Sequence, residues 1–290
     1  MMTSAPGKTV ADPRVVYILG SGHCGSTLLH LLMNAHPELC GTGELTFLTK
    51  MKKRAMEEGP DVKELEAVRS EFWQSVFERF QAESDVALEE LSLREFINSP
   101  MADYIRGSGR YPAWRAMHLA LFRALGEVSG REWVIDSSKT AGRCLQLHGV
   151  LGDRMRVIHL VRDRRGVFSS YLKKYGVGYG LRSSILVPIY CYLAQTILRK
   201  VTLRVRYEDL VRNPEATLRT ICRFLGIDYS AQMLDFRSVP DYSVNGNRMR
   251  FSSSSEIVLD EKWRRTLSKR NKAIFTVFGG WLNWLEGYTS

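Results

Sequence analysis

A glycine-rich turn at residues 20–27 (GSGHCGST) is the first part of the chain whose residue types suggest chemistry. It follows a β-branched run at 15–19 (VVYIL) and precedes a helical pattern at 26–35 (STLLHLLMNA). A turn between a strand and a helix can cradle an anion, because backbone N–H groups and the positive end of the helix dipole face it. The hydroxyls of Ser26 and Thr27 can donate to the same oxygens. We therefore expect a phosphate- or sulfate-like group here.

Three functional interpretations of this turn compete with a plain strand-to-helix connection. The letters fit G-x-G-x-x-G, a dinucleotide fingerprint, with Glu44 near the expected ribose-binding acid. That acid should end a second strand, whereas residues 40–43 (CGTG) are turn-like, which disfavours this interpretation. The turn also resembles a nucleoside-triphosphate loop, but Ser26 stands where the lysine should be. The third candidate is a phosphosulfate, which carries fewer charges and needs no magnesium clamp.

A second candidate anion site lies at residues 157–170 (VIHLVRDRRGVFSS). The predicted strand delivers Arg162 at its carboxyl end, and Ser170 follows on the next predicted helix. A guanidinium offers a charged, bidentate fork to a phosphate dianion, and a serine adds a neutral hydroxyl donor. Arg164 and Arg165 leave open the alternative of a surface arginine cluster.

The two candidate sites together resemble the sulfotransferases that use 3′-phosphoadenosine 5′-phosphosulfate (PAPS). An arginine followed eight residues later by a serine resembles the family's 3′-phosphate signature, and residues 18–44 resemble its 5′-phosphosulfate loop. The His36-Pro37 turn and Glu44 are similar to those of tyrosylprotein sulfotransferases. Further segments fit bacterial and carbohydrate-type members: 134–139 (VIDSSK), 205–214 (VRYEDLVRNP), 245–251 (NGNRMRF) and Trp263. The resemblance spans about residues 15–265, and 48–130 is unmatched.

The resemblance implies roles for named residues. Glu44 is expected to be the general base, with His23 and Lys139 as the other catalytic residues. The expected donor-binding residues are Gly22, His23, Cys24, Gly25, Ser26, Thr27, Arg162, Ser170, Arg248 and Arg250. One departure concerns His23, because most members carry lysine or arginine there. Either a protonated His23 or Lys139 is expected to replace that charge.

The elements that must position these residues alternate along the chain. Short apolar runs predict strands, and amphipathic or apolar stretches bounded by glycine or proline predict helices. Strands are expected at 15–19, 133–136, 156–161 and 203–207, and helices at 26–35, from 167, 185–199, 214–225 and 271–285. This alternation predicts an α/β fold: a central parallel sheet flanked by helices, as in the P-loop-like sulfotransferase fold. We expect one domain over 1–290, with a flexible tail at 1–12 and a helical insertion at about 48–130.

Composition narrows the classes of partner. The 41 basic and 31 acidic residues give a net charge of +10, which favours an anionic partner. Nucleic acid is not expected, because no helix-turn-helix or zinc-finger spacing appears. The apolar stretch 185–194 is shorter than the roughly 20 residues that span a bilayer, so stable membrane insertion is not expected.

The cysteines and histidines favour a metal-free protein in a reducing compartment. Five scattered cysteines form no C-x-x-C pair, and six histidines form no H-x-x-x-H pair. The first twelve residues lack the apolar run of a signal peptide, so a cytoplasmic location is expected.

The expected activity is transfer of a sulfuryl group from PAPS to an acceptor hydroxyl or amine. A small molecule, a carbohydrate or a lipid is the expected acceptor, a peptide tyrosine is a further candidate, and the pattern does not choose among them. The oligomeric state is open. A P-loop nucleotide kinase or related nucleotide-binding enzyme is the alternative, and a non-catalytic PAPS-binding module is a second one.

Overall fold

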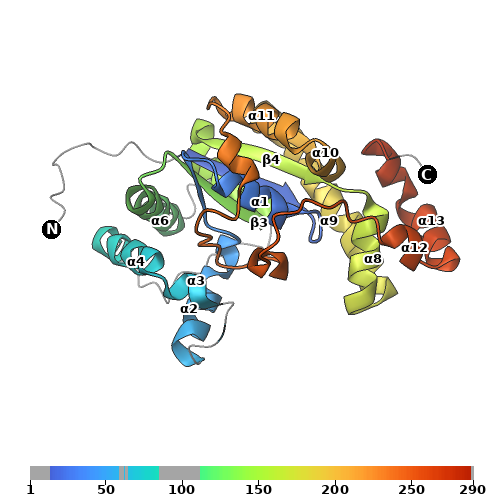
Figure 1. Cartoon of the computed structure of the whole chain (residues 1–290), viewed down its shortest axis with the longest axis horizontal. Helices are drawn as coiled ribbons and strands as arrows, with labels where there is room; N and C mark the ends of the chain where they lie inside the picture. The colour runs from blue at the N-terminus through green and yellow to red at the C-terminus, as the bar shows by residue number, and fades with distance from the viewer. Residues whose placement is uncertain (1–13, 59–61, 63–64, 85–111, 289–290) are drawn as a thin grey trace.

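A computed structural model describes residues 14–58, 62, 65–84 and 112–288. Its centre is a five-stranded sheet with the order β2-β3-β1-β4-β5 (Figure 1). Every neighbouring pair of strands is parallel. The strands are β1 (Arg14–Gly20), β2 (Leu39–Gly41), β3 (Trp133–Lys139), β4 (Met155–Val161) and β5 (Thr202–Arg206). The predicted α/β fold with a central parallel sheet flanked by helices is therefore confirmed.

The short strand β2 corrects one expectation. Residues 40–43 were expected to form a turn, but Cys40 and Gly41 pair with Val134 and Ile135 of β3. A Cβ atom on Gly41 would lie 2.6 Å from His30 Nε2 and 2.7 Å from Asn34 Oδ1. Glycine is therefore needed for close packing of the strand on the first helix, and the tertiary contacts override its weak strand propensity.

Helices cover both faces of the sheet. The first, α1 (Ser26–Asn34), follows the glycine turn as predicted. The others outside the insertion are α7 (Ala141–Leu151), α8 (Arg164–Tyr175), α9 (Val177–Ile197), α10 (Tyr207–Arg212), α11 (Pro214–Leu225), α12 (Trp263–Thr266) and α13 (Lys269–Leu285). Short 3-10 turns lie at Leu45–Phe47 (η1), Gly152–Arg154 (η5), Arg199–Val201 (η6), Ala231–Leu234 (η7) and Arg248–Phe251 (η8).

The described part of the insertion is helical, as expected. It contains α2 (Leu48–Glu57), α3 (Glu66–Arg69), α4 (Glu71–Glu83) and α6 (Pro112–Ser129). Figure 1 shows these helices on one side of the molecule, with α12 and α13 at the opposite end. Residues 85–111 of the insertion and the predicted tail at 1–12 lie outside the described residues. The single-domain organisation remains a prediction.

Two apolar cores sandwich the sheet. Alternate residues of β1 point to opposite faces, so Tyr17 joins one core and Ile18 the other. The first core takes in the helices of the insertion and α7, and the second takes in α1 and α11. Both faces being covered explains why the central strand β1 is apolar and buried from Val15 to Leu19 rather than alternating.

The strand order brings the predicted site residues to one edge. Strand β1 lies between β3 and β4, and the chain leaves β1 toward β3 before it returns to β4 on the other side. Ligands in open α/β folds bind at such a switch point, beyond the carboxyl ends of the strands. Leu19 pairs with Lys139, and Gly20 pairs with Leu160, two residues before Arg162. Among the described residues, no helix is both long and apolar enough to cross a membrane.

Candidate active site

The glycine turn contains two residues with left-handed backbone angles. Gly25, which precedes α1, has φ 95°, and a Cβ atom there would lie 2.3 Å from the Tyr207 ring. His23 also has a positive φ, 63°. Among the residues that the structure describes, no side chain caps the amino end of α1. Its first backbone N–H groups and the positive end of its dipole therefore face the turn.

An aromatic side chain covers the turn. The ring of Tyr171, from α8, meets the His23 imidazole edge-on with 4.7 Å between centroids. A Cβ atom on Gly22 would lie 2.1 Å from the Tyr171 hydroxyl, so only glycine fits beneath it. Burial, followed by the charges of Arg162, Lys174 and Lys139, lowers the pKa of His23. The imidazole is therefore mainly neutral at neutral pH, which favours Lys139 as the replacement for the family's cation.

Glu44 and Lys139 form an ion pair beside the turn. Lys139 Nζ lies 2.6 Å from Glu44 Oε1, and each side chain is 15% exposed. Lys139 ends β3 with φ 71°, a left-handed conformation that is costly for a residue with a side chain. It shares this property only with His23 among the non-glycine residues that the structure describes. Two such residues at one strand edge are typical of a functional site.

A buried polar network holds this pair in place. Asp136 is fully buried and accepts hydrogen bonds from Arg143 Nε at 2.9 Å and from the Ser138 hydroxyl. Ser138 Oγ in turn accepts from the Thr46 N–H at 3.2 Å, and Ser137 N–H donates to the Gly43 carbonyl at 2.8 Å. The backbone on both sides of Glu44 is thereby tied to the residues just before Lys139.

Arg162 joins the turn to a second site. Its Nη1 donates to the His23 carbonyl at 2.8 Å, and its Nη2 donates to the Asp260 carbonyl at 2.7 Å and to Asp260 Oδ2 at 3.1 Å. The guanidinium lies over the Tyr207 ring, 4.5 Å from its centroid. These contacts hold the fork at the carboxyl end of β4, as the sequence predicted.

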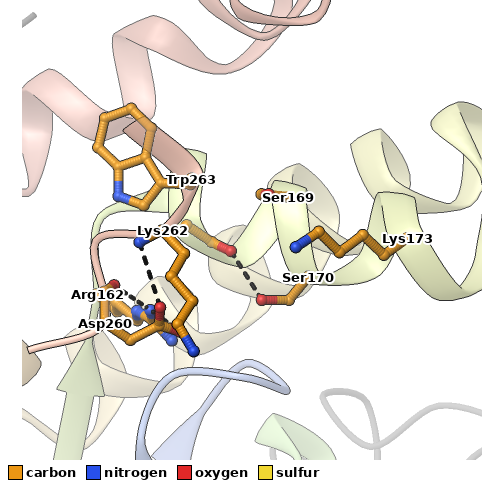
Figure 2. A pocket seen from close by; sticks show the side chains of 8 residues that line it. Arg162, Ser169, Ser170, Lys173, Asp260, Lys262 and Trp263 are labelled. Carbon is orange, nitrogen blue, oxygen red and sulfur yellow. Dashed lines mark hydrogen bonds and ion pairs between the residues drawn. The ribbon is translucent and has the colours of Figure 1, made fainter. Parts of the chain in front are cut away.

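A small cationic cavity of about 50 Å³ opens beside Arg162 (Figure 2). Its lining is Arg162, Gly166, Ser169, Ser170, Lys173, Asp260, Lys262 and Trp263. Ser170 lies on the first turns of α8, where its hydroxyl donates to the Gly166 carbonyl at 3.0 Å. Three cations and one acid face this cavity, so its electrostatics suit an anion.

Sequence reasoning found two of the cavity's polar residues, Arg162 and Ser170, and missed the lysines. Gly166, Ser170 and Lys173 are spaced i, i+4 and i+7, which places them on one helix face, so Lys173 could have been found. Asp260 and Lys262 carry no comparable signal, because 98 residues separate Asp260 from Arg162.

The remaining predicted donor-binding residues are arranged around the turn. Cys24 and Ser26 are buried, and burial raises the pKa of the Cys24 thiol. Thr27 Oγ1 accepts from the Asn247 N–H at 3.2 Å, which brings the segment before η8 onto α1. Arg250 Nε lies 3.4 Å from Asp241 Oδ2, and Arg248 is exposed. Neither of these arginines lines the cavity beside Arg162.

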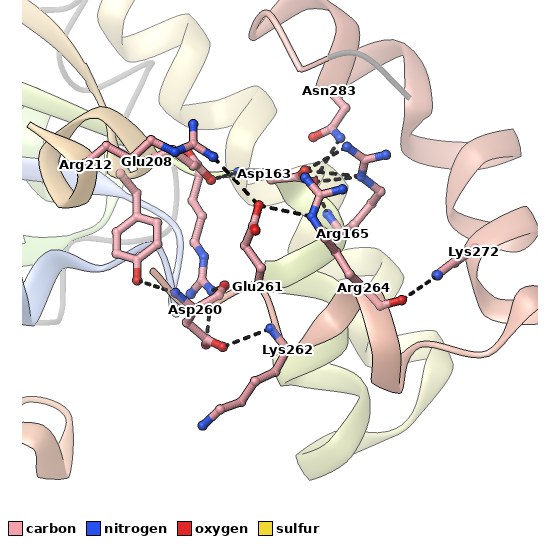
Figure 3. Close-up of polar contacts among 12 residues, drawn as sticks. Asp163, Arg165, Glu208, Arg212, Asp260, Glu261, Lys262, Arg264, Lys272 and Asn283 are labelled. Carbon is pink, nitrogen blue, oxygen red and sulfur yellow. Dashed lines mark hydrogen bonds and ion pairs between the residues drawn. The ribbon is translucent and has the colours of Figure 1, made fainter. Parts of the chain in front are cut away.

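The buried ion pair of Arg164 with Glu286 contacts the glycine turn through Ser21. Arg164 donates to Ser21 Oγ at 3.0 Å, and its Nε donates to Glu286 Oε2 at 2.7 Å. Its backbone N–H donates to Asn283 Oδ1 at 2.8 Å. Figure 3 shows the neighbouring contacts, in which Asn283 and Arg165 converge on Asp163. The C-terminal helix is thus tied to the glycine turn through one buried arginine.

Known proteins resemble this chain in sequence pattern and in fold. A model of the sulfotransferase family matches residues 13–231. A sulfotransferase domain from the Synechococcus PCC 7002 olefin synthase is similar in structure, with a TM-score of 0.56 and 21% identity, covering 92% of this chain and 93% of that one. A sulfotransferase domain from the curacin biosynthetic pathway also has a TM-score of 0.56, with 16% identity, covering 91% of this chain and 97% of that one.

The search of curated protein sequences gave no match. At these identities the two structural likenesses support the fold, and the family model carries the assignment. Its match extends over the glycine turn, the Glu44–Lys139 pair, Arg162 and Ser170. Within the described ranges, no group of three or more histidine, cysteine or acidic side chains is arranged to hold a metal ion. The chain belongs to the sulfotransferase family.

Proposed function

We propose that this sulfotransferase takes its sulfuryl group from PAPS and transfers it to an acceptor hydroxyl or amine. The observation that carries the proposal is the presence of two anion sites joined by one residue. Arg162 binds the carbonyl of His23 in the glycine turn and also lines the cationic cavity beside Ser170. PAPS carries two separate anionic groups on its ribose, the 5′-phosphosulfate and the 3′-phosphate. A nucleoside triphosphate would leave the second site without a partner.

Each anionic group of PAPS has its own proposed binding residues. The glycine turn, with the free amino end of α1, would hold the phosphosulfate. Arg162 and Ser170, with Lys173 and Lys262, would hold the 3′-phosphate. Arg248 and Arg250, on the segment that contacts Thr27, are proposed to lie along the nucleotide.

Transfer requires a proton acceptor and a cation at the same place. Sulfuryl transfer runs in line between two oxygens through a loose state, so the protein mainly positions groups and offsets charge. PAPS supplies the sulfuryl group. Glu44 accepts the proton that the acceptor hydroxyl loses as it attacks, and Lys139 offsets the charge that grows on the departing bridging oxygen. The 2.6 Å contact between them keeps both groups at the edge of the turn.

The acceptor belongs to a broad class in this proposal. A small-molecule, carbohydrate or lipid hydroxyl would suit the Glu44 base, and nucleic acid is not proposed as a partner. A cytoplasmic location and a single-domain organisation are part of the same proposal. All five cysteines are free and buried, which suits a reducing compartment.

Nucleotide binding tests the proposal without an acceptor. Adenosine 3′,5′-bisphosphate should raise the melting temperature in the absence of metal. At about 100 times its dissociation constant it should add roughly 2.7 kcal/mol to the free energy of unfolding. ATP with Mg²⁺ and adenosine 5′-monophosphate are the comparison ligands. Greater stabilisation by ATP with Mg²⁺ would favour a P-loop kinase instead.

Substitutions locate the binding. Arg162→Ala should weaken binding of the bisphosphate by about 2–4 kcal/mol, because the arginine is a buried, charged donor. Ser170→Ala should cost about 1 kcal/mol, because it removes one neutral donor. Arg156→Ala is the matched control, since Arg156 lies on the same strand and donates to the Asp153 carbonyl. Isothermal calorimetry measures all three, and unchanged affinity in Arg162→Ala would reject the site.

A further inference from the structure

Asp260 accepts the hydrogen bonds from Arg162 Nη2 that a bound phosphate would need. A guanidinium has five N–H donors, and the two on Nη2 point in different directions. Here Nη2 donates to both the carbonyl and Oδ2 of Asp260, while Nη1 donates to His23. A phosphate bound bidentately takes parallel N–H groups from neighbouring nitrogens. Such a ligand therefore has to take the place of at least one Asp260 oxygen.

The Asp260 carboxylate lies at the surface, where it can turn away from Arg162. The Asp260 side chain is 45% exposed, whereas the Arg162 side chain is 8% exposed. Burial opposes its charge, but the hydrogen bond from Arg162 and the charge of Arg162 outweigh this and lower the pKa of Asp260. It is therefore an anion at neutral pH, on a linker between η8 and α12 that has solvent on one side. Figure 2 shows it facing the same cavity as Lys262 and Lys173.

A phosphate dianion and this carboxylate cannot share Arg162 without repulsion. Two like charges about 4 Å apart repel appreciably even at an effective dielectric constant near 20. The other cations of the cavity, Lys173 and Lys262, come from α8 and the linker and remain available to a ligand when the carboxylate turns away.

We propose that Asp260 is an internal competitor for the 3′-phosphate site and sets the affinity for the nucleotide. It satisfies Arg162 when the site is empty and is displaced when a phosphate dianion binds. Because displacement has to overcome an existing ion pair, the site favours a dianion over singly charged groups and releases the product bisphosphate readily. The inference rests on the proposed function, in which Arg162 holds the 3′-phosphate.

The test compares two neighbouring acids. Asp260→Asn keeps the size of the side chain and removes its charge. Glu261→Gln is the matched control, because Glu261 makes the same change one residue later but pairs with Arg264 at 3.0 Å and Arg212 at 3.8 Å rather than with Arg162 (Figure 3). Calorimetry would be run with adenosine 3′,5′-bisphosphate and with adenosine 5′-monophosphate, which lacks the 3′-phosphate.

Asp260→Asn should bind the bisphosphate about tenfold more tightly than wild type. Its affinity for the monophosphate should change by less than about twofold, as should the affinities of Glu261→Gln for both ligands. The gain should vanish in Asp260→Asn combined with Arg162→Ala. If Asp260→Asn melts too low to measure, Asp260→Ser replaces it, because serine also lacks the charge.

Two failures are distinguishable. If wild type prefers the bisphosphate and Arg162→Ala loses that preference, but Asp260→Asn binds equally or more weakly, then Asp260 orients Arg162 and the competitor role is overturned while the function stands. If wild type does not distinguish the bisphosphate from the monophosphate and Arg162→Ala is unchanged, the proposed donor site fails, and the competitor role fails with it.

Discussion

In the proposed mechanism, the ion pair between Glu44 and Lys139 places a proton acceptor and a cation in one contact. A carboxylate can accept a proton from an attacking hydroxyl, and an ammonium beside it can offset negative charge that grows on a leaving oxygen. The contact also keeps the ammonium next to the glycine turn, where negative charge would develop. Both side chains are mostly buried, so water screens the pair less than it screens a surface pair.

Replacement of Glu44 separates catalysis from binding. Glu44→Gln should lower turnover about 10²–10⁴-fold, because a general base acts in the transition state. Affinity for adenosine 3′,5′-bisphosphate should stay nearly unchanged. Turnover is measured with PAPS and an acceptor found by screening sugars, sterols, phenols and alkyl alcohols.

Glu132→Gln is the control for this substitution. Glu132 pairs with Arg14 at 3.0 Å beside the amino end of β3, so the same change is made far along the strand from Lys139. It should leave turnover unchanged. Near wild-type turnover in Glu44→Gln would place the base elsewhere, and His23 would be the next residue to test.

At the scale of elements, three strand ends and one helix start make the site. Most of this could be predicted from sequence: β1, β3, β4 and β5 were expected within a few residues, because apolar β-branched runs dictate them. The edge strand β2 could not be, since three residues carry no periodicity and its Gly41 is required by packing on α1. The ion pair of Glu44 with Lys139 was also out of reach, because it depends on which strand lies next to β1.

The left-handed loop residue Gly25 gives an element-scale prediction. Gly25→Ala should lower the free energy of unfolding by about 3 kcal/mol or more, because it adds both an unfavourable φ and an overlap with the Tyr207 ring. Gly130→Ala is the control: its φ is also positive, 63°, but no neighbouring atom of the described residues lies within 4 Å of the added Cβ. That variant should lose only about 1–2 kcal/mol.

Urea denaturation measures both glycine variants. Equal losses for the two would mean that the ring of Tyr207 gives way easily and that the loop is not locked by packing. A larger loss for Gly25→Ala would show that Tyr207, on α10, helps to fix the shape of the turn.

At the scale of the whole molecule, the C-terminal helix supports the turn at the other end of the chain. The side chains of Arg164 and Glu286 are almost completely buried, with exposures of 1% and 0%. Glu286→Gln leaves the buried guanidinium without its charge partner and should lower the free energy of unfolding by about 3–5 kcal/mol. Glu215→Gln, in a pair that is 53% exposed on both sides, should cost less than about 1 kcal/mol. A small loss in Glu286→Gln, measured by denaturant titration, would show that α13 is not coupled to the fold in this way.

Buried histidines should make the whole molecule sensitive to acid. Burial lowers the pKa of His30 and of His159 to about 4, and lowers that of His118 well below its usual value. The unfolded chain protonates its histidines near pH 6.5, so below that pH protons favour unfolding until the folded pKa is reached. Each of His30 and His159 should therefore remove about 1–2 kcal/mol of stability between pH 7 and pH 5.

The contribution of His159 can be isolated. It lies on β4, where Nδ1 lies 2.5 Å from Gln195 Oε1, and its buried Nε2 has no hydrogen-bond partner in the part of the chain that the structure describes. His159→Leu removes the titrating group, so the loss of stability from pH 7 to pH 5 should shrink by about 1–2 kcal/mol relative to wild type. The measurement is the free energy of unfolding in urea at both pH values. Any effect of leucine on packing is present at both pH values and cancels in the difference.

His148→Leu is the control. At its half-buried position near Asp153, it should reduce the loss of stability between pH 7 and pH 5 by less than His159→Leu does. An unchanged pH dependence in His159→Leu would mean that this histidine titrates alike in the folded and unfolded states.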